Sequence, residues 1–311
     1  MIKMYDTIIV GAGPGGYTAG IYAKRYGLDV LIIGEEPGGL CNEAHVVENW
    51  PGTKSIEGSE LVENMREHVE SLDVEVKEGR VFNIDREDDR FILESDDGEY
   101  EAKSVILAIG TEKRRLDIEN EEKFRGKGVS YCTTCDAPLY KGKDVGVVGG
   151  RDSAAKSALL LAEHAENVYI IYRRDELKAE HTLKQRCLDN DKIEMVYEAV
   201  PEKLEGDEVL ERVVLDNGEE MDLDGLFIEI GSVPNKVLMK IGDEKIEREE
   251  GYIKVDEDQS TNIPGVFAAG DVTTGSNKFR QIVTAAAEGS IAAVSAYTYV
   301  KEEKHKVQWG S

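Results

Sequence analysis

The sequence predicts an α/β protein built from two similar units, the second inserted into the first. A strand, a turn of glycines, a helix and a second strand occur twice in this order, at residues 6–33 and again at 144–171. Each unit also contains a similar apolar strand that runs into a glycine, at 104–110 and at 225–231. This succession is typical of Rossmann-like dinucleotide-binding domains, in which parallel strands are joined through helices. The 311 residues are enough for two such domains.

The repeated elements also predict the domain boundaries. We expect residues 1–113 and 247–311 to form the first domain and residues 114–246 to form the inserted one, connected by polar crossing segments at 111–120 and 242–251. Two linkers lying side by side would permit a rigid-body rotation of one domain against the other. The elements expected to complete the first domain are a late apolar strand at 265–269 and a helix of small residues from 281 to about 299.

Composition and charge exclude several classes of function. The chain has 63 acidic and 38 basic residues, a formal charge of −25, so it would repel the phosphates of nucleic acid and of anionic lipid. No apolar run approaches the ~20 residues of a membrane span, and the first apolar run is too short for a signal peptide. Four cysteines at uneven spacing are not a secreted disulfide framework. We expect a cytoplasmic protein without a nucleic-acid or membrane partner.

The first glycine turn predicts a nucleotide site. Gly11 allows the tight turn, Gly13 lets the backbone approach a pyrophosphate, and Gly16 lets helix and strand pack closely. The phosphates would lie at the helix N-terminus, where free N–H groups and the helix dipole favour anions. Glu35 and Glu36 follow the second strand, where an acidic residue commonly binds a ribose hydroxyl.

The second glycine turn predicts a different nucleotide. Gly149 and Ala154 keep the first and third positions, but Arg151 replaces the second glycine, and its side chain obstructs close approach of the backbone. The next strand ends in Arg173 and Arg174, with no acid for a ribose hydroxyl. Arginines there suit a 2′-phosphate, which favours NADP(H) over NAD(H). The alternatives are that the arginines only solvate a strand end, or that another electron donor is used.

A pair of cysteines precedes the second glycine turn. Cys132 and Cys135 are three residues apart, and thiols at this spacing can close a small disulfide. In the reduced pair, this setting commonly lowers the pKa of one thiol. Asp136 follows directly and could relay a proton to the departing thiolate. Structural zinc would need two further ligands at regular spacing, which the remaining cysteines and the five histidines do not offer. We therefore predict a redox dithiol and no metal, with an inert cysteine pair as the alternative.

These features, with further motifs, resemble the low-molecular-weight thioredoxin reductases, a family of flavoprotein disulfide reductases. The resemblance extends over essentially the whole chain, and the cysteine motif and the Ala-Ala-Gly-Asp segment are its most specific parts. The supporting motifs are Gly38-Gly39, Glu-Asn-Trp-Pro-Gly at 48–52, Gly-Val-Ser at 128–130 before the cysteines, Pro234-Asn235, residues 264–272 and Arg280-Gln281.

The resemblance implies FAD in the first domain and NADPH in the second. Asp271 would hydrogen-bond the ribityl or phosphate side of FAD, and the N-terminus of the last helix would face the flavin ring and stabilise its negative charge on reduction. The residues expected to bind FAD are Gly11, Gly13, Pro14, Gly15, Gly16, Glu35, Glu36, Gly38, Gly39, Asn49, Gly110, Gly270, Asp271, Arg280, Gln281 and Ile282. Those expected to bind NADPH are Gly149, Gly150, Arg151, Ser153, Ala154, Arg173, Arg174 and Lys178.

The resemblance also implies a mechanism. NADPH would give a hydride to the flavin, and the reduced flavin would reduce the Cys132–Cys135 disulfide. Cys135 would be the thiol next to the flavin, Cys132 the one that attacks the disulfide of thioredoxin, and Asp136 the proton donor. The pair cannot face both the flavin and an outside protein at once, so a domain rotation is implied. Members of the family are homodimers.

Departures from the family pattern fall mainly on the nicotinamide side. Besides Arg151, Lys178 stands where an arginine is usual, Lys156 and Ser157 stand at commonly acidic positions, and Leu40 replaces a frequent glutamine. Three alternatives follow: a disulfide reductase supplied by reduced ferredoxin or a deazaflavin, a dithiol oxidase that passes electrons from small thiols to oxygen, and a non-enzymatic FAD-binding or redox-sensing module. Of the isolated cysteines, Cys187 is expected to be a packing residue and Cys41 a small buried one, with a third redox thiol beside the flavin loop as the alternative for Cys41.

Overall fold

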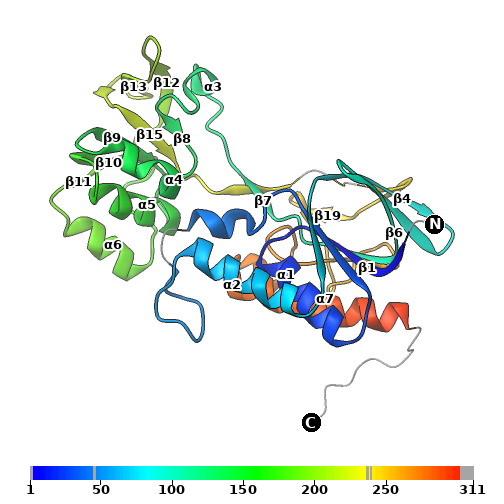
Figure 1. The fold of residues 1–311 in the computed structure, drawn as a ribbon. Coiled ribbons are helices and arrows are strands. Elements are labelled where there is room, and N and C mark those ends of the chain that lie inside the picture. Colours follow the sequence, from blue (N-terminus) through cyan, green and yellow to red (C-terminus); the bar gives the residue numbers. More distant parts are fainter. Residues whose placement is uncertain (1–2, 45–46, 236–237, 239, 302–311) are drawn as a thin grey trace. The chain divides into compact units, whose positions relative to one another are not determined.

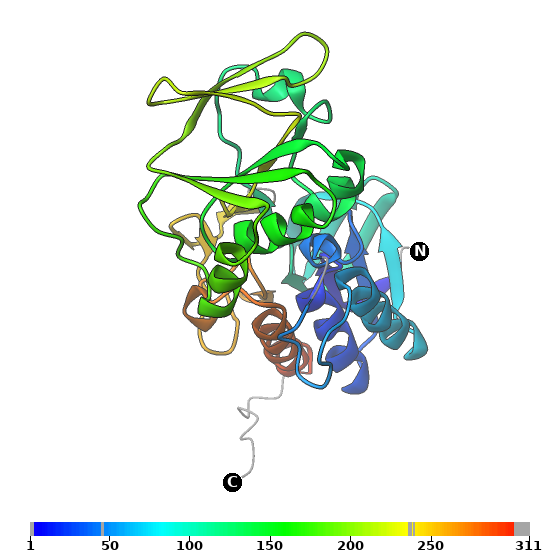
Figure 2. The same ribbon diagram turned by 90° about the vertical axis from the view of Figure 1, so that its left-hand side faces the viewer.

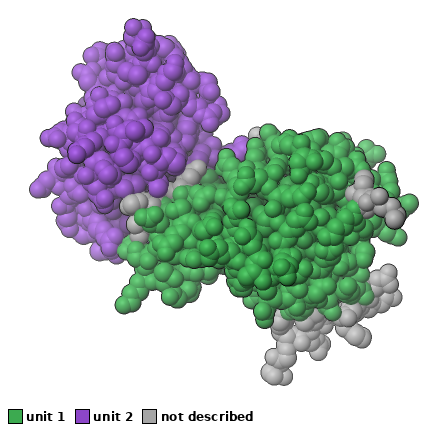
Figure 3. All heavy atoms as spheres, in the orientation of Figure 1, with its two compact units in different colours: residues 1–111, 234–311 green, residues 112–233 purple. Residues whose placement is uncertain are grey.

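A computed structural model describes residues 3–44, 47–235, 238 and 240–301. The chain divides into two compact units, residues 1–111 with 234–311, and residues 112–233 (Figure 3). The chain crosses between them at β7 (Thr111–Lys113) and β16 (Ser232–Pro234), two short strands that pair with each other.

The second boundary differs from the predicted one. The sequence placed the return to the first domain at 247 and a crossing segment at 242–251, whereas the structure assigns residues from Pro234 onward to unit 1. The reason is packing: Leu238, Ile241 and Ile246 are buried in the core of unit 1. The polar residues between them, which suggested a linker, form two small hairpins instead. These are β17 (Lys240–Ile241) with β18 (Glu244–Lys245), and β19 (Arg248–Glu249) with β20 (Tyr252–Ile253).

Unit 1 is built on a parallel sheet. Its strands β3, β2, β1 and β6 lie in that order, and β21 pairs with β6 on the far side. An antiparallel hairpin, β4 and β5, extends β6 from its first half. The bounds are β1 (Met4–Val10), β2 (Val30–Gly34), β3 (Glu75–Glu78), β4 (Val81–Glu87), β5 (Arg90–Ser95), β6 (Gly98–Leu107) and β21 (Val266–Ala268).

Both faces of this sheet are covered, which explains why its strands are continuous apolar runs. Three helices lie on one face, and α1 and α7 run side by side there (Figures 1 and 2). The hairpin β4–β5 and the segments around Ile241 and Ile263 pack on the other face. The helical elements of unit 1 are α1 (Pro14–Arg25), η1 (Gly39–Glu43), α2 (Gly58–Ser71), η3 (Ser276–Lys278) and α7 (Ile282–Val300).

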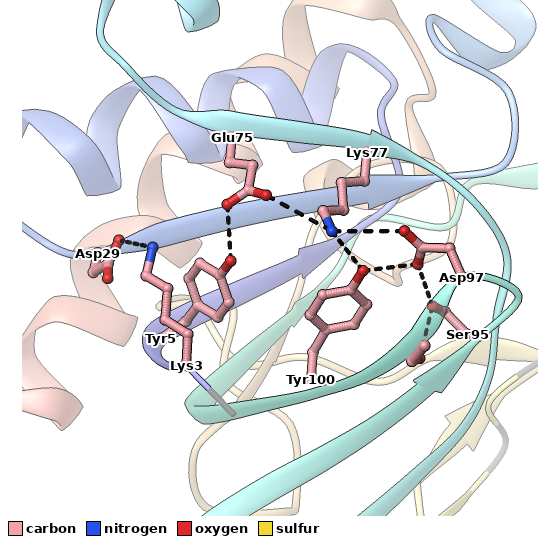
Figure 4. Close-up of polar contacts among 9 residues, drawn as sticks. Lys3, Tyr5, Asp29, Glu75, Lys77, Ser95, Asp97 and Tyr100 are labelled. Atoms are coloured by element: carbon pink, nitrogen blue, oxygen red, sulfur yellow. Dashed lines mark hydrogen bonds and ion pairs between the residues drawn. The ribbon is translucent and has the colours of Figure 1, made fainter. Parts of the chain in front are cut away.

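A polar network joins side chains of β1, β3 and β6 in this sheet (Figure 4). The Tyr5 hydroxyl donates to Glu75 at 2.8 Å, and Lys77 donates to the Tyr100 hydroxyl at 2.7 Å. Tyr100 in turn donates to Asp97 at 2.8 Å. Burial and the hydrogen bond to the Glu75 carboxylate raise the pKa of Tyr5, so this hydroxyl stays a donor. The network ties β3 to β1 and to the turn between β5 and β6.

Unit 2 repeats the parallel arrangement. Its strands lie in the order β11, β10, β9, β15, β8, and every neighbouring pair is parallel. Helices α5 and α6 pack on one face, and the antiparallel sheet β12–β13–β14 packs on the other. The strands are β8 (Val129–Ser130), β9 (Asp144–Val148), β10 (Asn167–Tyr172), β11 (Ile193–Tyr197), β12 (Pro201–Glu205), β13 (Arg212–Leu215), β14 (Glu220–Asp222) and β15 (Gly225–Ile228). The helical elements are α3 (Glu121–Phe124), α4 (Thr133–Asp136), η2 (Ala137–Tyr140), α5 (Asp152–Ala162) and α6 (His181–Leu188).

The predicted fold class, two Rossmann-like domains with the second inserted into the first, is therefore confirmed. Within the described ranges, no helix is both long enough and apolar enough to span a membrane.

Candidate active site

The first glycine turn joins β1 to α1 and is shaped by close packing. Gly11 has φ +115°, and a Cβ there would lie 2.1 Å from the Ala108 carbonyl oxygen. A Cβ on Gly16 would lie 1.9 Å from the carbonyl oxygen of Gly11. Both positions therefore require glycine. At Gly13, by contrast, the nearest atom to such a Cβ is 3.9 Å away, so the backbone faces open space.

Helix α1 starts at this open point. Gly13 is its N-cap, Pro14 is its first residue, and no side chain caps the N-terminus. The amide groups of the first turn, including those of Gly15 and Gly16, are free of a side-chain acceptor and are suited to a phosphate. The Gly38 amide donates to the carbonyl of Ala12 at 2.7 Å, which holds the Gly38-Gly39 loop beside the turn. Glu35 and Glu36 are exposed between this loop and β2.

Tertiary packing joins two predicted flavin-binding segments that are far apart in sequence. The Asn49 amide donates to the side-chain oxygen of Gln281 at 2.9 Å. Gln281 is also the N-cap of α7 and forms a capping box with Thr284. The helix N-terminus that starts at Ile282 is therefore fixed beside the loop containing Asn49.

The Gly270-Asp271 segment is held by a carboxylate that sequence reasoning missed. Glu288, buried on α7, accepts from the Gly270 amide and from the Thr273 hydroxyl, both at 2.8 Å. Burial raises the pKa of Asp271 to about 6, partly offset by Arg280. A signal for Glu288 was present, because it is the single charged residue in the otherwise apolar or neutral α7.

These residues fit a bound dinucleotide. Arg280 lies 3.7 Å above the Tyr252 ring and donates through Nε to the Asp271 carbonyl at 3.2 Å. Its Nη2 is buried without a hydrogen-bond partner in the described part of the chain, although such an atom normally has one. Gly110, with φ +60°, has open space where a Cβ would lie. A bound ligand could accept a hydrogen bond from this guanidinium nitrogen and fill the open space beside Gly110.

The second glycine turn joins β9 to α5. Gly149 has φ +148°, and a Cβ there would lie 2.2 Å from the Glu229 carbonyl oxygen, so glycine is required. Arg151 is the N-cap of α5, in an extended conformation with φ −115°, and the helix has no side-chain cap. The backbone at 151 therefore accepts any residue without strain. Ala154 is buried at the position of the third glycine, and Ser153 is exposed in the first turn.

The basic residues predicted to bind NADPH lie around this turn. The Lys178 amide donates to the Gly150 carbonyl at 2.7 Å, and its ammonium pairs with Glu176 at 3.2 Å. Arg173 and Arg174 are exposed just beyond β10, and neither forms an ion pair with any residue that the structure describes. In a chain with so many acidic residues, unpaired arginines at a strand end are suited to an anionic ligand.

Cys132 and Cys135 form a disulfide at the start of α4. Cys132 is the N-cap, and its sulfur accepts from the Cys135 amide at 3.2 Å. Within unit 2, Cys132 is half-buried and Cys135 is exposed. Leu139 follows on η2 with 69% of its surface exposed, so an apolar side chain lies in solvent close to the disulfide in sequence.

The other two cysteines are not part of this site. Cys41 and Cys187 are buried free thiols, and burial raises the pKa of each to about 11. Both are therefore inert at neutral pH. The structure holds no cluster of three or more potential metal ligands among the residues it describes.

The chain matches the family model described as pyridine nucleotide-disulphide oxidoreductase over residues 5–289. It belongs to this family. Over 308 residues it is 38% identical to the thioredoxin reductase of Bacillus subtilis (strain 168), with 96% of each chain covered. The solved structure of Lactococcus lactis thioredoxin reductase is also 38% identical, covers 96% of this chain and 99% of its own, and superposes with a TM-score of 0.91. The resemblance to thioredoxin reductases inferred from sequence is thus confirmed.

Membership implies that this pyridine nucleotide-disulphide oxidoreductase uses a flavin and a pyridine nucleotide. A second solved structure to which the chain is similar has a different name. A ferredoxin-flavin thioredoxin reductase from Clostridium acetobutylicum is 34% identical, covers 96% of this chain and 99% of its own, and has a TM-score of 0.53.

Proposed function

We propose that this oxidoreductase is a thioredoxin reductase that passes two electrons from NADPH, through FAD and the Cys132–Cys135 disulfide, to thioredoxin. The observation that carries the proposal is the disulfide itself. It lies at the start of a short helix in the same unit as the second glycine turn, and one of its sulfurs belongs to an exposed residue. The names of the similar proteins, thioredoxin reductases of two bacteria, support thioredoxin as the acceptor.

The cofactor assignments follow the two units. FAD is proposed for unit 1. There its pyrophosphate would contact the open backbone at Gly13, its ribityl chain would contact Asp271, and its flavin ring would lie at the start of α7. NADPH is proposed for unit 2, where Arg173 and Arg174 would bind the 2′-phosphate. When bound, FAD supplies a two-electron carrier between a nicotinamide and a disulfide. The homodimer and the cytoplasmic location expected from the sequence stay predictions.

The chain's own chemistry in the second half-reaction is thiol–disulfide exchange. The thiolate of reduced Cys132 attacks the thioredoxin disulfide, which forms a mixed disulfide and releases one thioredoxin thiolate. Cys135 then attacks Cys132, which re-forms the internal disulfide and releases the second thiolate. Asp136 exchanges protons with the thiols. The net change is NADPH, one proton and a thioredoxin disulfide converted to NADP⁺ and a thioredoxin dithiol.

The direct test is an anaerobic visible spectrum of the purified protein during titration with NADPH. Rapid bleaching of the flavin band is expected, whereas bleaching by dithionite but not by NADPH or NADH would overturn NADPH as the donor. Cys135→Ser then tests the acceptor side. This variant should keep flavin and its reduction by NADPH, but should lower thioredoxin turnover to below about a thousandth, because the mixed disulfide with Cys132 is not resolved. Preserved turnover would contradict the mechanism.

A second candidate is the same FAD and disulfide chemistry with reduced ferredoxin or a deazaflavin as donor. The observations that favour it are Arg151 at the second glycine position and the pairing of Lys178 with Glu176, which weakens one cation for a 2′-phosphate. The unpaired Arg173 and Arg174 favour NADPH. The NADPH titration separates the two candidates.

A further inference from the structure

Behind the redox disulfide, unit 2 contains a buried polar chain that the mechanism above does not use. The Thr133 hydroxyl donates to the Ser157 hydroxyl at 2.9 Å, and the Ser157 hydroxyl donates to Oε1 of Glu229 at 3.0 Å. Thr133, Ser157 and Glu229 are 5%, 8% and 7% exposed. The chain links the residue that directly follows Cys132, on α4, through α5 to the end of β15.

A lysine forms an ion pair with the carboxylate of Glu229. Lys113, the last residue of β7, donates to both carboxylate oxygens, at 3.4 and 3.3 Å. A buried carboxylate is stable as an anion when a cation and further donors compensate it, and the Lys113 ammonium and the Ser157 hydroxyl provide both. An ionised carboxylate only accepts hydrogen bonds.

The charge of Glu229 fixes the direction of both hydrogen bonds, from Thr133 to Ser157 and from Ser157 to Glu229. Because Glu229 only accepts, the single hydroxyl proton of Ser157 must point to it. Ser157 then has only lone pairs to offer Thr133, so the single hydroxyl proton of Thr133 must point to Ser157. That proton is therefore unavailable to the neighbouring cysteines.

We propose that Glu229 is a positioning residue of the redox site, which through Ser157 turns the Thr133 hydroxyl proton away from the reduced cysteines. A thiolate that accepts fewer hydrogen bonds is less stabilised, so the thiol has a higher pKa and the dithiol is a stronger reductant. Such a dithiol passes its electrons onward, as the proposed function, on which this inference rests, requires.

The ionisable groups on α4 itself and on the elements packed against it are the same in every variant below. The elements packed against α4 are α5, which carries Asp152 and Lys156, and η2, which carries Tyr140. Helix α4 itself contains Asp136.

The test is the pH dependence of alkylation in the fully reduced, anaerobic holoprotein, with iodoacetamide as the probe and Cys132 and Cys135 quantified by peptide mass. Ser157→Ala breaks the chain without changing a charge. It frees the Thr133 proton, so the midpoint of one cysteine should fall by about one pH unit, a tenfold gain in acidity, which is a typical effect of a hydrogen bond to a charged group.

Thr133→Val removes the proton itself and supplies the decisive comparison. The double variant S157A/T133V should return to within about twofold of Thr133→Val alone, because the released donor no longer exists. Ser295→Ala is the matched control: it also removes a helical hydroxyl, one that donates to the Asp258 carbonyl at 2.6 Å in unit 1, and should shift nothing.

Two outcomes would overturn the inference: unchanged midpoints in Ser157→Ala, or a shift that persists in the double variant. If Ser157→Ala does not fold, Glu229→Gln with and without Thr133→Val decides by the same criteria, since an amide no longer fixes the direction of the chain. The assay needs neither NADPH nor thioredoxin. A protein that turns over thioredoxin without the shift therefore overturns only this inference, and one with the shift but no turnover overturns only the proposed function.

Discussion

The two glycine turns of this protein share one fold but meet different packing demands. In unit 1 a Cβ on Gly16 would lie 1.9 Å from a backbone oxygen, whereas in unit 2 the corresponding Ala154 fits without strain. Helix α1 therefore approaches its turn more closely than α5 does. At the middle position the backbone is extended in both turns, at Gly13 and at Arg151. Glycine there serves ligand approach, not backbone conformation.

A glycine in this motif can be required for two different reasons, the conformation and packing of the backbone or the approach of a ligand, and the sequence motif does not distinguish them. At Gly11 and Gly149 the positive φ and the adjacent backbone demand glycine whether or not a nucleotide binds. At position 13 or 151 only a ligand would demand it. The sequence change at 151 is therefore compatible with an intact fold and bears on ligand binding alone.

The largest expected effect is on the third position of each turn. Gly16→Ala should destabilise unit 1 by at least about 3 kcal/mol, because a backbone oxygen cannot move aside easily. Ala154→Gly, the matched change in unit 2, should lose only about 1 kcal/mol of helix stability. Denaturant unfolding of both variants, with flavin retained per chain after gel filtration, measures the difference. Equal losses of unfolding free energy in the two variants would contradict the inference that α1 lies closer to its glycine turn than α5 does.

The second effect concerns the buried carboxyl beside the first site. The pKa of Asp271 is raised to about 6, above its unfolded value of 3.8, so between these pH values the folded chain holds the extra proton. Its contribution to stability should therefore fall by about 3 kcal/mol as the pH rises from 3 to 7, most of it between the two pKa values. The measurement is the unfolding free energy of flavin-free protein against pH, for the wild type and for Asp271→Asn. Parallel curves would contradict the prediction.

A third, somewhat smaller effect tests the second site. Replacing Arg173 and Arg174 together with Ala should raise the KM for NADPH by about thirtyfold, because two charge-assisted contacts to the 2′-phosphate are lost. The KM for NADH, which lacks this phosphate, should change little. Steady-state kinetics with both nucleotides measures this selectivity, and equal effects would count against 2′-phosphate binding.

The smallest effect is expected at the position where the two turns differ most in sequence. Arg151→Gly restores the glycine of the first turn, and since the backbone is already extended, unfolding should shift by less than about 1 kcal/mol. The KM for NADPH should rise about threefold if the guanidinium contacts a phosphate. A marked fall in KM would show instead that the side chain obstructs the nucleotide.

Much of the fold was predictable because its signals are local. Two strand–glycine–helix–strand successions identified both parallel sheets, and the buried strands could be recognised as apolar runs. The boundary at 246 was wrong because the stretch after Pro234 looks like a linker in composition. Leu238, Ile241 and Ile246 are too sparse to suggest a core until the sheet that buries them is known.

Short spacings along the chain were enough to predict the fold class, the family and the redox cysteine pair, because each of these depends on residues that are close together in the sequence. Long-range packing, by contrast, brings Asn49 to Gln281 and the Gly270 amide to Glu288. It also connects Glu229 to Thr133 through Ser157. These partners are up to 232 residues apart. A buried polar group must find a partner wherever packing brings one, and no local pattern records which partner that is.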